Sequence, residues 1–128
     1  MLYRDDYFEV WVDPARSLVR LARTERAFES IDHARASYAS LAIALATVER
    51  RSHGVLLDLR AARPRSEPEF ERFASESSAT LLRPFRSVSV LVKSAVGRLQ
   101  VQRIEKERGT AVFTVFTDES EALAHATR

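Results

Sequence analysis

Segments with strand character and segments with helix character alternate along this chain of 128 residues. Five short runs are rich in β-branched, aromatic or aliphatic residues. Each of the last four runs is followed by a segment with helical patterning or capping residues. The expected strands are residues 7–12, 17–23, 55–59, 88–92 and 111–116. Connections of helical length between successive strands require parallel pairing. We therefore expect an α/β domain on a mostly parallel five-stranded sheet.

The first two expected strands are joined by a turn too short for a crossover. Asp13 and Pro14 stand between them, and Pro presets the backbone angle that such a turn needs. The sequence therefore predicts an antiparallel N-terminal hairpin and the order ββαβαβαβα. Phe8 and Trp11 fall on different faces of the first strand, so one aromatic is expected to stay exposed at the edge of the sheet.

Capping residues and helical spacing locate the four helices. The expected helices span residues 31–51, 67–83, 95–107 and 119–126, the first capped by Ser30, the second by Ser66 and the last by Thr117 or Asp118. Gly54 is expected to stop the first helix. In the third helix, Val96, Leu99 and Ile104 are predicted to face inward.

Length, charge and cysteine content limit the class of protein. A chain of this length fits one domain, residues 1–128, and the absence of Cys excludes disulfides and thiolate chemistry. Neither a signal peptide nor a membrane span is apparent, so a cytoplasmic location is expected. The net charge is +2, and residues 51–109 hold 12 basic against 7 acidic residues. This surplus is small beside that of nucleic-acid binders, which argues against a nucleic-acid partner.

Two short segments add a family resemblance to this order of elements. Residues 54–59 read Gly-Val-Leu-Leu-Asp-Leu, and residues 115–123 read Val-Phe-Thr-Asp-Glu-Ser-Glu-Ala-Leu. Together with the element order, they resemble the STAS domain, the fold of bacterial anti-sigma-factor antagonists. The resemblance implies a non-enzymatic regulatory module that binds another protein, such as an anti-sigma kinase or a signalling protein.

In antagonists of this family, an Asp-Ser pair begins the helix after the Leu-Asp-Leu strand, and a partner kinase phosphorylates that Ser. The corresponding residue here is Ser66. Arg65 stands where the family has Asp, and Glu67-Pro68 follows in place of small residues. Ser66 is therefore either a phosphorylation site or a helix cap, and the module is expected to act without the usual phospho-switch if it is only a cap.

A basic loop follows the strand that ends near Asp58. Arg60, Arg63 and Arg65 belong to this loop, and Arg98 follows the next strand along the chain, after Lys93. Because the carboxyl ends of parallel strands share one edge, these cations are expected to converge.

The basic loop supports two hypotheses about binding. One is an acidic partner surface; the other is an anionic small molecule, nucleotide or lipid head group. A solvated basic loop is the alternative to both. Asp58 has two interpretations: a functional carboxylate at a strand end, or one that accepts hydrogen bonds from loop amides.

The chain offers no catalytic or metal-binding motif. It lacks a Gly-x-Ser-x-Gly elbow, and its glycines, Gly54, Gly97 and Gly109, are too dispersed for a phosphate-binding loop. The three histidines do not form a set with metal-ligand spacing and are expected at the surface. We therefore expect no catalytic residues, metal or cofactor. A homodimer through the N-terminal edge strand is a third, structural hypothesis.

Overall fold

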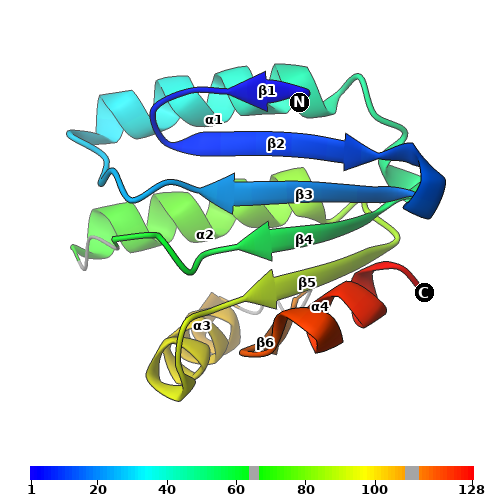
Figure 1. Cartoon of the computed structure of the whole chain (residues 1–128). Coiled ribbons are helices and arrows are strands. Elements are labelled where there is room, and N and C mark those ends of the chain that lie inside the picture. The colour runs from blue at the N-terminus through cyan, green and yellow to red at the C-terminus, as the bar shows by residue number, and fades with distance from the viewer. Residues whose placement is uncertain (64–66, 109–112) are drawn as a thin grey trace.

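The computed structural model describes residues 1–63, 67–108 and 113–128, with residues 104–108 described by their backbone only. Six strands form one mixed sheet, and their order across the sheet is their order along the chain (Figure 1). The strands are β1 (Tyr3–Arg4), β2 (Phe8–Asp13), β3 (Leu18–Arg23), β4 (Gly54–Asp58), β5 (Ser87–Leu91) and β6 (Thr114–Phe116). The expected α/β class is confirmed.

The N-terminal part of the sheet is antiparallel and the remainder is parallel. β1 pairs with β2 and β2 with β3 in antiparallel fashion, whereas β3 to β6 run parallel. The prediction of five strands was wrong by one, because Tyr3 of β1 lies opposite Val10 and covers the outer side of β2. A strand of two residues is too short to show a periodic pattern. The hairpin of β2 and β3, joined by the short 3-10 turn Pro14–Arg16, is confirmed.

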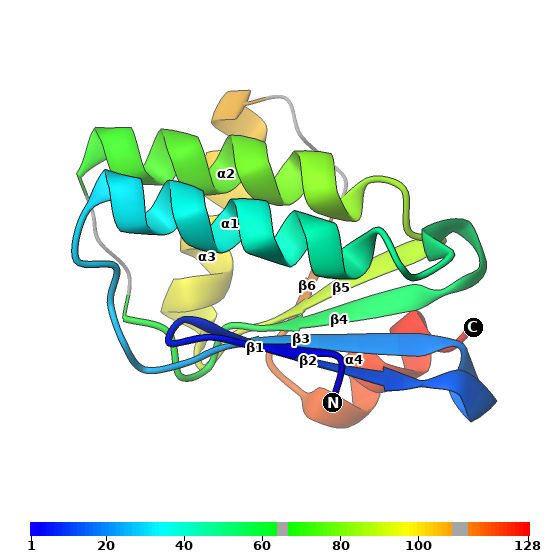
Figure 2. The ribbon, with the colours of Figure 1, turned by 90° about the horizontal axis from the view of Figure 1, so that it is seen from above.

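Helices cover the two faces of the sheet unequally. The helices α1 (Ile31–Leu45), α2 (Pro68–Leu82) and α3 (Ala95–Arg108) lie on one face, and α4 (Glu119–Ala126) lies on the other (Figure 2). Alternate residues of each strand therefore enter different cores. Val10, Val19, Val55 and Val90 belong to the large core under α1 to α3 and are fully buried. The small core under α4 contains Leu18, Leu56, Leu91, Ala122 and Ala126.

The predicted caps of the first and last helices are confirmed. The Ser30 hydroxyl accepts a hydrogen bond from the His33 amide (3.2 Å), and the Asp118 carboxylate accepts one from the Glu121 amide (3.1 Å). The end of α1 differs from the prediction: the helix stops at Leu45, and Arg50–Ser52 forms a separate 3-10 turn. Gly54 therefore opens β4 and does not end the helix.

Two residues of α3 that were predicted to face the core point to the solvent. Val96 and Leu99, expected to face inward, are 74% and 66% exposed. Val101 packs against the large core instead. Helical spacing links Val96 with Leu99 but does not say which side of the helix meets the sheet. The side chain of Ile104 lies outside the described residues.

Candidate functional site

The carboxyl ends of β3, β4 and β5 lie together at one edge of the sheet. Ala22, Asp58 and Leu91 occupy matching positions across these three strands. Just beyond them, the Leu59 amide donates a hydrogen bond to the Leu91 carbonyl (2.8 Å), which keeps the loops after β4 and β5 side by side. This is the edge where open α/β sheets usually bind their ligands.

A pocket of about 360 Å³ runs inward from this edge, between the sheet and the three helices on its larger side. Its walls are mainly apolar and include Leu21, Leu57, Phe70, Val90, Val101 and Phe113. Tyr38 of α1 and Ser78 of α2 also line it, and their hydroxyls are 3.2 Å apart. The volume lies at the lower end of the range for small-molecule sites in proteins. The pocket can therefore hold a small apolar ligand.

Arg23, the last residue of β3, supplies a cation to the pocket wall. Its guanidinium lies 4.3 Å from the ring centroid of Phe28 and 5.3 Å from that of Phe8. It donates hydrogen bonds to the carbonyls of Tyr7 and Arg26, both at 3.1 Å. Burial lowers the pKa of Arg23, and the charges of Tyr38, Asp5 and Tyr7 act in the opposite direction. Cation–π contacts and carbonyl bonds thus hold this charge in place.

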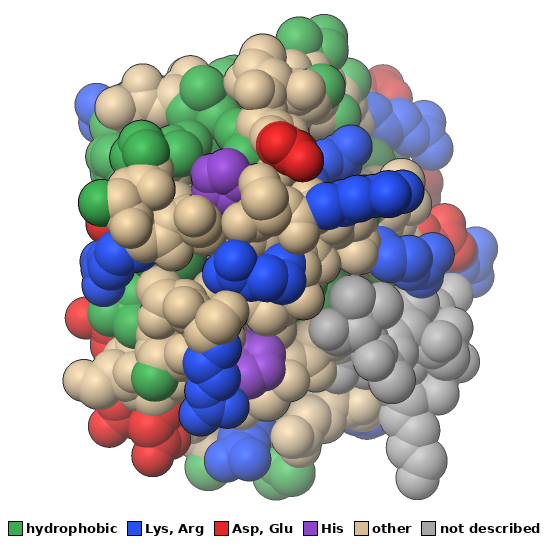
Figure 3. All heavy atoms as spheres, turned by 90° about the vertical axis from the view of Figure 1, so that its right-hand side faces the viewer, with side chains coloured by type: hydrophobic (Ala, Val, Ile, Leu, Met, Phe, Trp, Pro, Cys, Tyr) green, Lys and Arg blue, Asp and Glu red, His purple; other side chains and the backbone are tan. Residues whose placement is uncertain are grey.

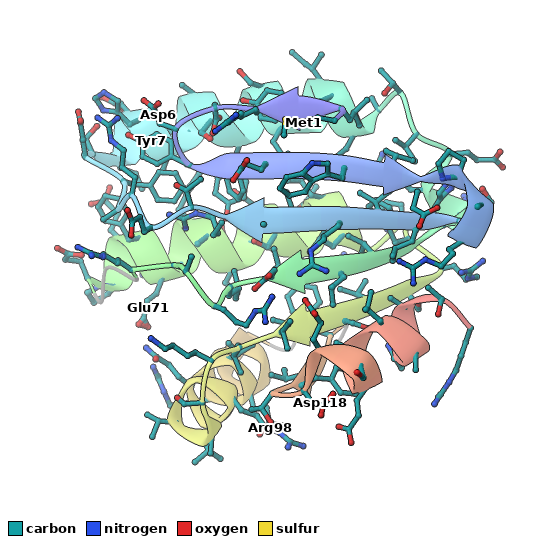
Figure 4. All side chains as sticks on the ribbon, in the orientation of Figure 1. Met1, Asp6, Tyr7, Glu71, Arg98 and Asp118 are labelled. Atoms are coloured by element: carbon teal, nitrogen blue, oxygen red, sulfur yellow. The ribbon has the colours of Figure 1, made fainter. Side chains whose placement is uncertain are left out.

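Arg63 and Lys93 are two exposed cations that line the pocket. Within the described part of the chain neither forms an ion pair, unlike Arg60, which is also exposed and lines the pocket. Their convergence agrees with the expectation that loops after parallel strands meet at one edge. Among the described residues that line the pocket, Glu71 is the one acidic residue. Its carboxylate lies 3.5 Å from the guanidinium of Arg103 on α3. Figure 4 shows Glu71 beside the first turns of α2.

Asp58 and Arg60 form an ion-pair cluster with Arg20 and Glu119. The Asp58 carboxylate accepts hydrogen bonds from the Arg60 guanidinium at 3.0 and 2.8 Å and from Arg20 at 3.0 Å. Glu119, at the start of α4, accepts from Arg20 at 2.6 Å and from Arg60 at 2.9 Å. This cluster joins β3, β4 and α4.

The surroundings of Asp58 explain its role in the loop. Its carboxylate also accepts a hydrogen bond from the Arg60 amide at 3.0 Å. This agrees with the interpretation of Asp58 as an acceptor for loop amides. Burial alone would raise the pKa of Asp58, but the hydrogen bonds from Arg60 and the charges of Arg60 and Arg20 lower it below its usual range. Asp58 is therefore an ionised anchor for the start of the loop, and its partner Arg60 is already neutralised.

Among the described residues of the expected site, Arg98 does not join the pocket. Arg98 is exposed on α3 and does not line it; Figure 4 shows Arg98 on α3 well away from Glu71. Arg65 and Ser66 lie outside the described residues. The described N-cap of α2 is Glu67, with Pro68 at the first helical position, so the helix begins one residue later than predicted.

One histidine differs from the expectation of surface histidines. His125 of α4 is half-buried, its Nδ1 lies 2.7 Å from the Ser89 hydroxyl, and its ring contacts Phe116. Burial, with a smaller effect of the Arg128 charge, lowers its pKa. Within the three described ranges, no group of three or more His, Asp or Glu side chains is arranged to hold a metal ion. None of the described helices combines the length and apolar character that crossing a membrane requires.

The pocket and Arg23 were not predicted from the sequence. The pocket exists because Ala74, Ser75 and Ser78 on the sheet-facing side of α2 are small, so the helix leaves space above the strands. In the sequence, the indication of a pocket was the presence of small residues on the helix face that points toward the sheet. Arg23 reads as an ordinary polar residue at the end of a strand, and only the fold shows that rings and carbonyls surround it.

No family model, curated protein or solved structure matches this chain. Over its described residues the chain is an α/β domain with a six-stranded mixed sheet, four α-helices and a mainly apolar pocket at the carboxyl edge of the parallel strands.

Proposed function

We propose that the protein is a non-enzymatic binding module that holds a small molecule in the pocket between the sheet and α1 to α3. The pocket itself carries this proposal: it has about 360 Å³ of space and a mainly apolar wall, and it opens where α/β proteins bind ligands. Protein interiors are normally close-packed, so a cavity of this size lowers stability unless a ligand fills it.

A blocking variant tests this function. Ala74 lines the pocket, so Ala74→Leu should fill part of it, whereas Ala36 is exposed on α1 and Ala36→Leu should not. An environment-sensitive dye, 1-anilinonaphthalene-8-sulfonate, should show strong fluorescence with the wild type and with Ala36→Leu. The signal should fall severalfold with Ala74→Leu. Equal fluorescence for all three proteins would contradict the proposal, provided urea titrations show that the Leu variants are folded.

Regulatory protein binding is the second candidate function, and the exposure of Val96 and Leu99 favours it. Two large apolar side chains, 74% and 66% exposed, stand one helical turn apart on α3. Helix α3 also contributes Gly97, Gln100 and Val101 to the pocket, so a partner on its outer side would sit next to a bound ligand.

Such a module would resemble a STAS-type antagonist in the cytoplasm, with a signalling protein or an anti-sigma kinase as its partner. The resemblance supports this candidate through the element order. Cross-linking of tagged protein in native lysate should recover a partner with the wild type and lose it with the double change Val96→Ser and Leu99→Ser. Ser66→Asp should leave recovery unchanged if no phospho-switch operates. A homodimer would appear in the same experiment as a cross-link between two copies.

A further inference from the structure

The balance of charge around the pocket points to the chemistry of its ligand. We infer that the ligand is an anionic amphiphile, with an apolar body inside the pocket and a carboxylate or phosphate group held by Arg23, Arg63 and Lys93. This inference rests on the proposed binding function and adds the ligand's charge to it.

The described pocket lining holds more cations than its own carboxylates can neutralise. Arg23, Arg60, Arg63 and Lys93 line the pocket, against Glu71. Arg60 is paired with Asp58 and Glu119, and Glu71 is paired with Arg103. Three cations, Arg23, Arg63 and Lys93, therefore remain without an ion-pair partner among the described residues. They come from the ends of three neighbouring strands, so a single anion at this edge is the simplest common partner.

The environment of Arg23 strengthens this assignment. A guanidinium has five N–H donors, and the described carbonyl contacts use its Nε and Nη2 atoms. Its position is fixed by Phe8 and Phe28, so binding an anion would cost little further ordering. Arg23 is half-buried, and a partly buried charge interacts more strongly with a counter-ion than a fully exposed one does, because less water screens the pair. Arg23 is therefore suited to bind the anionic group of a ligand that enters the pocket.

The apolar wall sets the other half of the ligand. Beyond the cations, the lining is made of aliphatic and aromatic side chains from the sheet and from α1 to α3. A free phosphate would leave that space empty, and a purely apolar molecule would leave the three cations without a counter-ion. An amphiphile satisfies both parts of the pocket.

A cluster of basic residues is not by itself what distinguishes the pocket from the rest of the surface. Figure 3 views the molecule from the opposite edge of the sheet, and Lys and Arg side chains gather there as well. On that side Arg50 donates to the Leu81 carbonyl, and Arg86 donates to the carbonyls of Ser52 and Ala126. Those arginines are used in tying backbone segments together. The combination of unpaired cations with an apolar pocket is found at the carboxyl edge.

Four ligands that share an eight-carbon tail and differ in their head group test the inference. Nonanoate, octyl phosphate, octanol and octylammonium can be titrated into the purified protein by calorimetry, below the concentrations at which they form micelles. Nonanoate or octyl phosphate should bind several-fold more tightly than octanol, since each favourable charge contact contributes up to a factor of about five. Octylammonium should bind most weakly. Comparing the two anions distinguishes a carboxylate site from a phosphate site.

Charge-removing variants locate the anion. Arg63→Gln and Lys93→Gln should each weaken nonanoate binding by about threefold to fivefold while leaving octanol binding unchanged. Arg51→Gln, at an exposed position in the turn before β4, is the matched control and should change neither. Raising the salt concentration should weaken the binding of the anions and leave octanol unaffected.

Different results would refute the anionic nature of the ligand and the proposed binding function. Equal affinity for nonanoate and octanol, with no effect of Arg63→Gln or Lys93→Gln, would overturn the anionic assignment and leave the apolar binding site standing. Tighter binding of octylammonium would also overturn the assignment. Failure of all four ligands to bind, together with a dye signal that Ala74→Leu does not reduce, would refute both.

Discussion

A single carboxylate, that of Asp58, ties the loop after β4 to the neighbouring strand β3, and Arg20 and Arg60 link it to Glu119 at the start of α4. Its side chain is only 12% exposed, and it accepts hydrogen bonds from Arg20, from the Arg60 side chain and from the Arg60 amide. A buried charge without these partners would be costly, so the cluster is stable only when complete. Arg60 thereby becomes part of the scaffold, which leaves Arg63 and Lys93 as the exposed cations of the pocket.

The change Asp58→Asn should lower the free energy of unfolding by about 1–3 kcal/mol at neutral pH, because it removes the more buried of the two counter-ions, Asp58 and Glu119, that Arg20 and Arg60 share. The exposed Asp32 offers a control, and Asp32→Asn should cost less than about 0.5 kcal/mol. Urea denaturation measures both. An equal effect of the two changes would mean that the cluster contributes nothing beyond a surface pair.

The lowered pKa of Asp58 also predicts a pH dependence. A carboxyl whose pKa is lower in the folded state than its unfolded value of about 3.9 stabilises the fold above that value. The contribution is lost as the pH falls from about 4 through the folded pKa. The stability difference between the wild type and Asp58→Asn should therefore shrink on acidification. Urea titrations at about pH 6 and about pH 3 would show it; a constant difference would contradict it.

Gly54 shows how close the backbones of β4 and α4 approach. A Cβ atom added at Gly54 would lie 1.7 Å from the Ala126 carbonyl oxygen, so a side chain there would force α4 off the sheet. Gly54→Ala should therefore destabilise the protein by about 3 kcal/mol or more. Gly97→Ala is the control: its nearest contact would be an ordinary 3.5 Å, and Ala favours a helix over Gly by up to about 1 kcal/mol. Thermal denaturation should move the two variants in opposite directions.

At the scale of elements, α3 has one side in the large core and another in solvent. Gly97, Gln100 and Val101 face the pocket, while Val96 and Leu99 are exposed. A helix that displays large apolar side chains gains little stability from them. Their presence is therefore a stronger argument for an interaction surface than for folding.

The double change Val96→Ser and Leu99→Ser should alter the free energy of unfolding by no more than about 0.5 kcal/mol per site, because neither side chain is buried. Val101→Ala should cost about 1 kcal/mol or more, since Val101 packs on the core. Chemical denaturation compares them. A large loss in the double variant would show that α3 packs in the orientation that the sequence suggested.

Much of the element order could be predicted, because strand composition and the capping residues Ser30 and Asp118 are local features. The side of α3 that faces the sheet could not, since residues 95–101 contain apolar residues on more than one side. The candidate site was predicted only in part: Arg63 and Lys93 follow from strand ends that converge. The pocket depends on the space between layers, and Arg23 depends on rings brought from distant segments.

At the scale of the whole molecule, α4 closes a second core that would otherwise be open. Leu18, Leu56 and Leu91 lie beneath it and are almost completely buried. A chain that lacks residues 118–128 should expose all three and self-associate, because contiguous apolar surface drives aggregation. A chain that ends at Thr127 keeps α4 and should behave as the wild type. Sedimentation velocity would distinguish the two; an equally monomeric shortened chain would contradict this role of α4.

The identity of strand order in the sheet and in the sequence has a consequence for how the protein is made. Each new strand leaving the ribosome can pair at once with the strand before it, so the sheet can grow in one direction during synthesis. None of the described strands has to be inserted between two others that are already paired, which avoids slow rearrangement of long-range pairing. Helix α4, which emerges after β6, then returns across β4 and β5 and covers the second face.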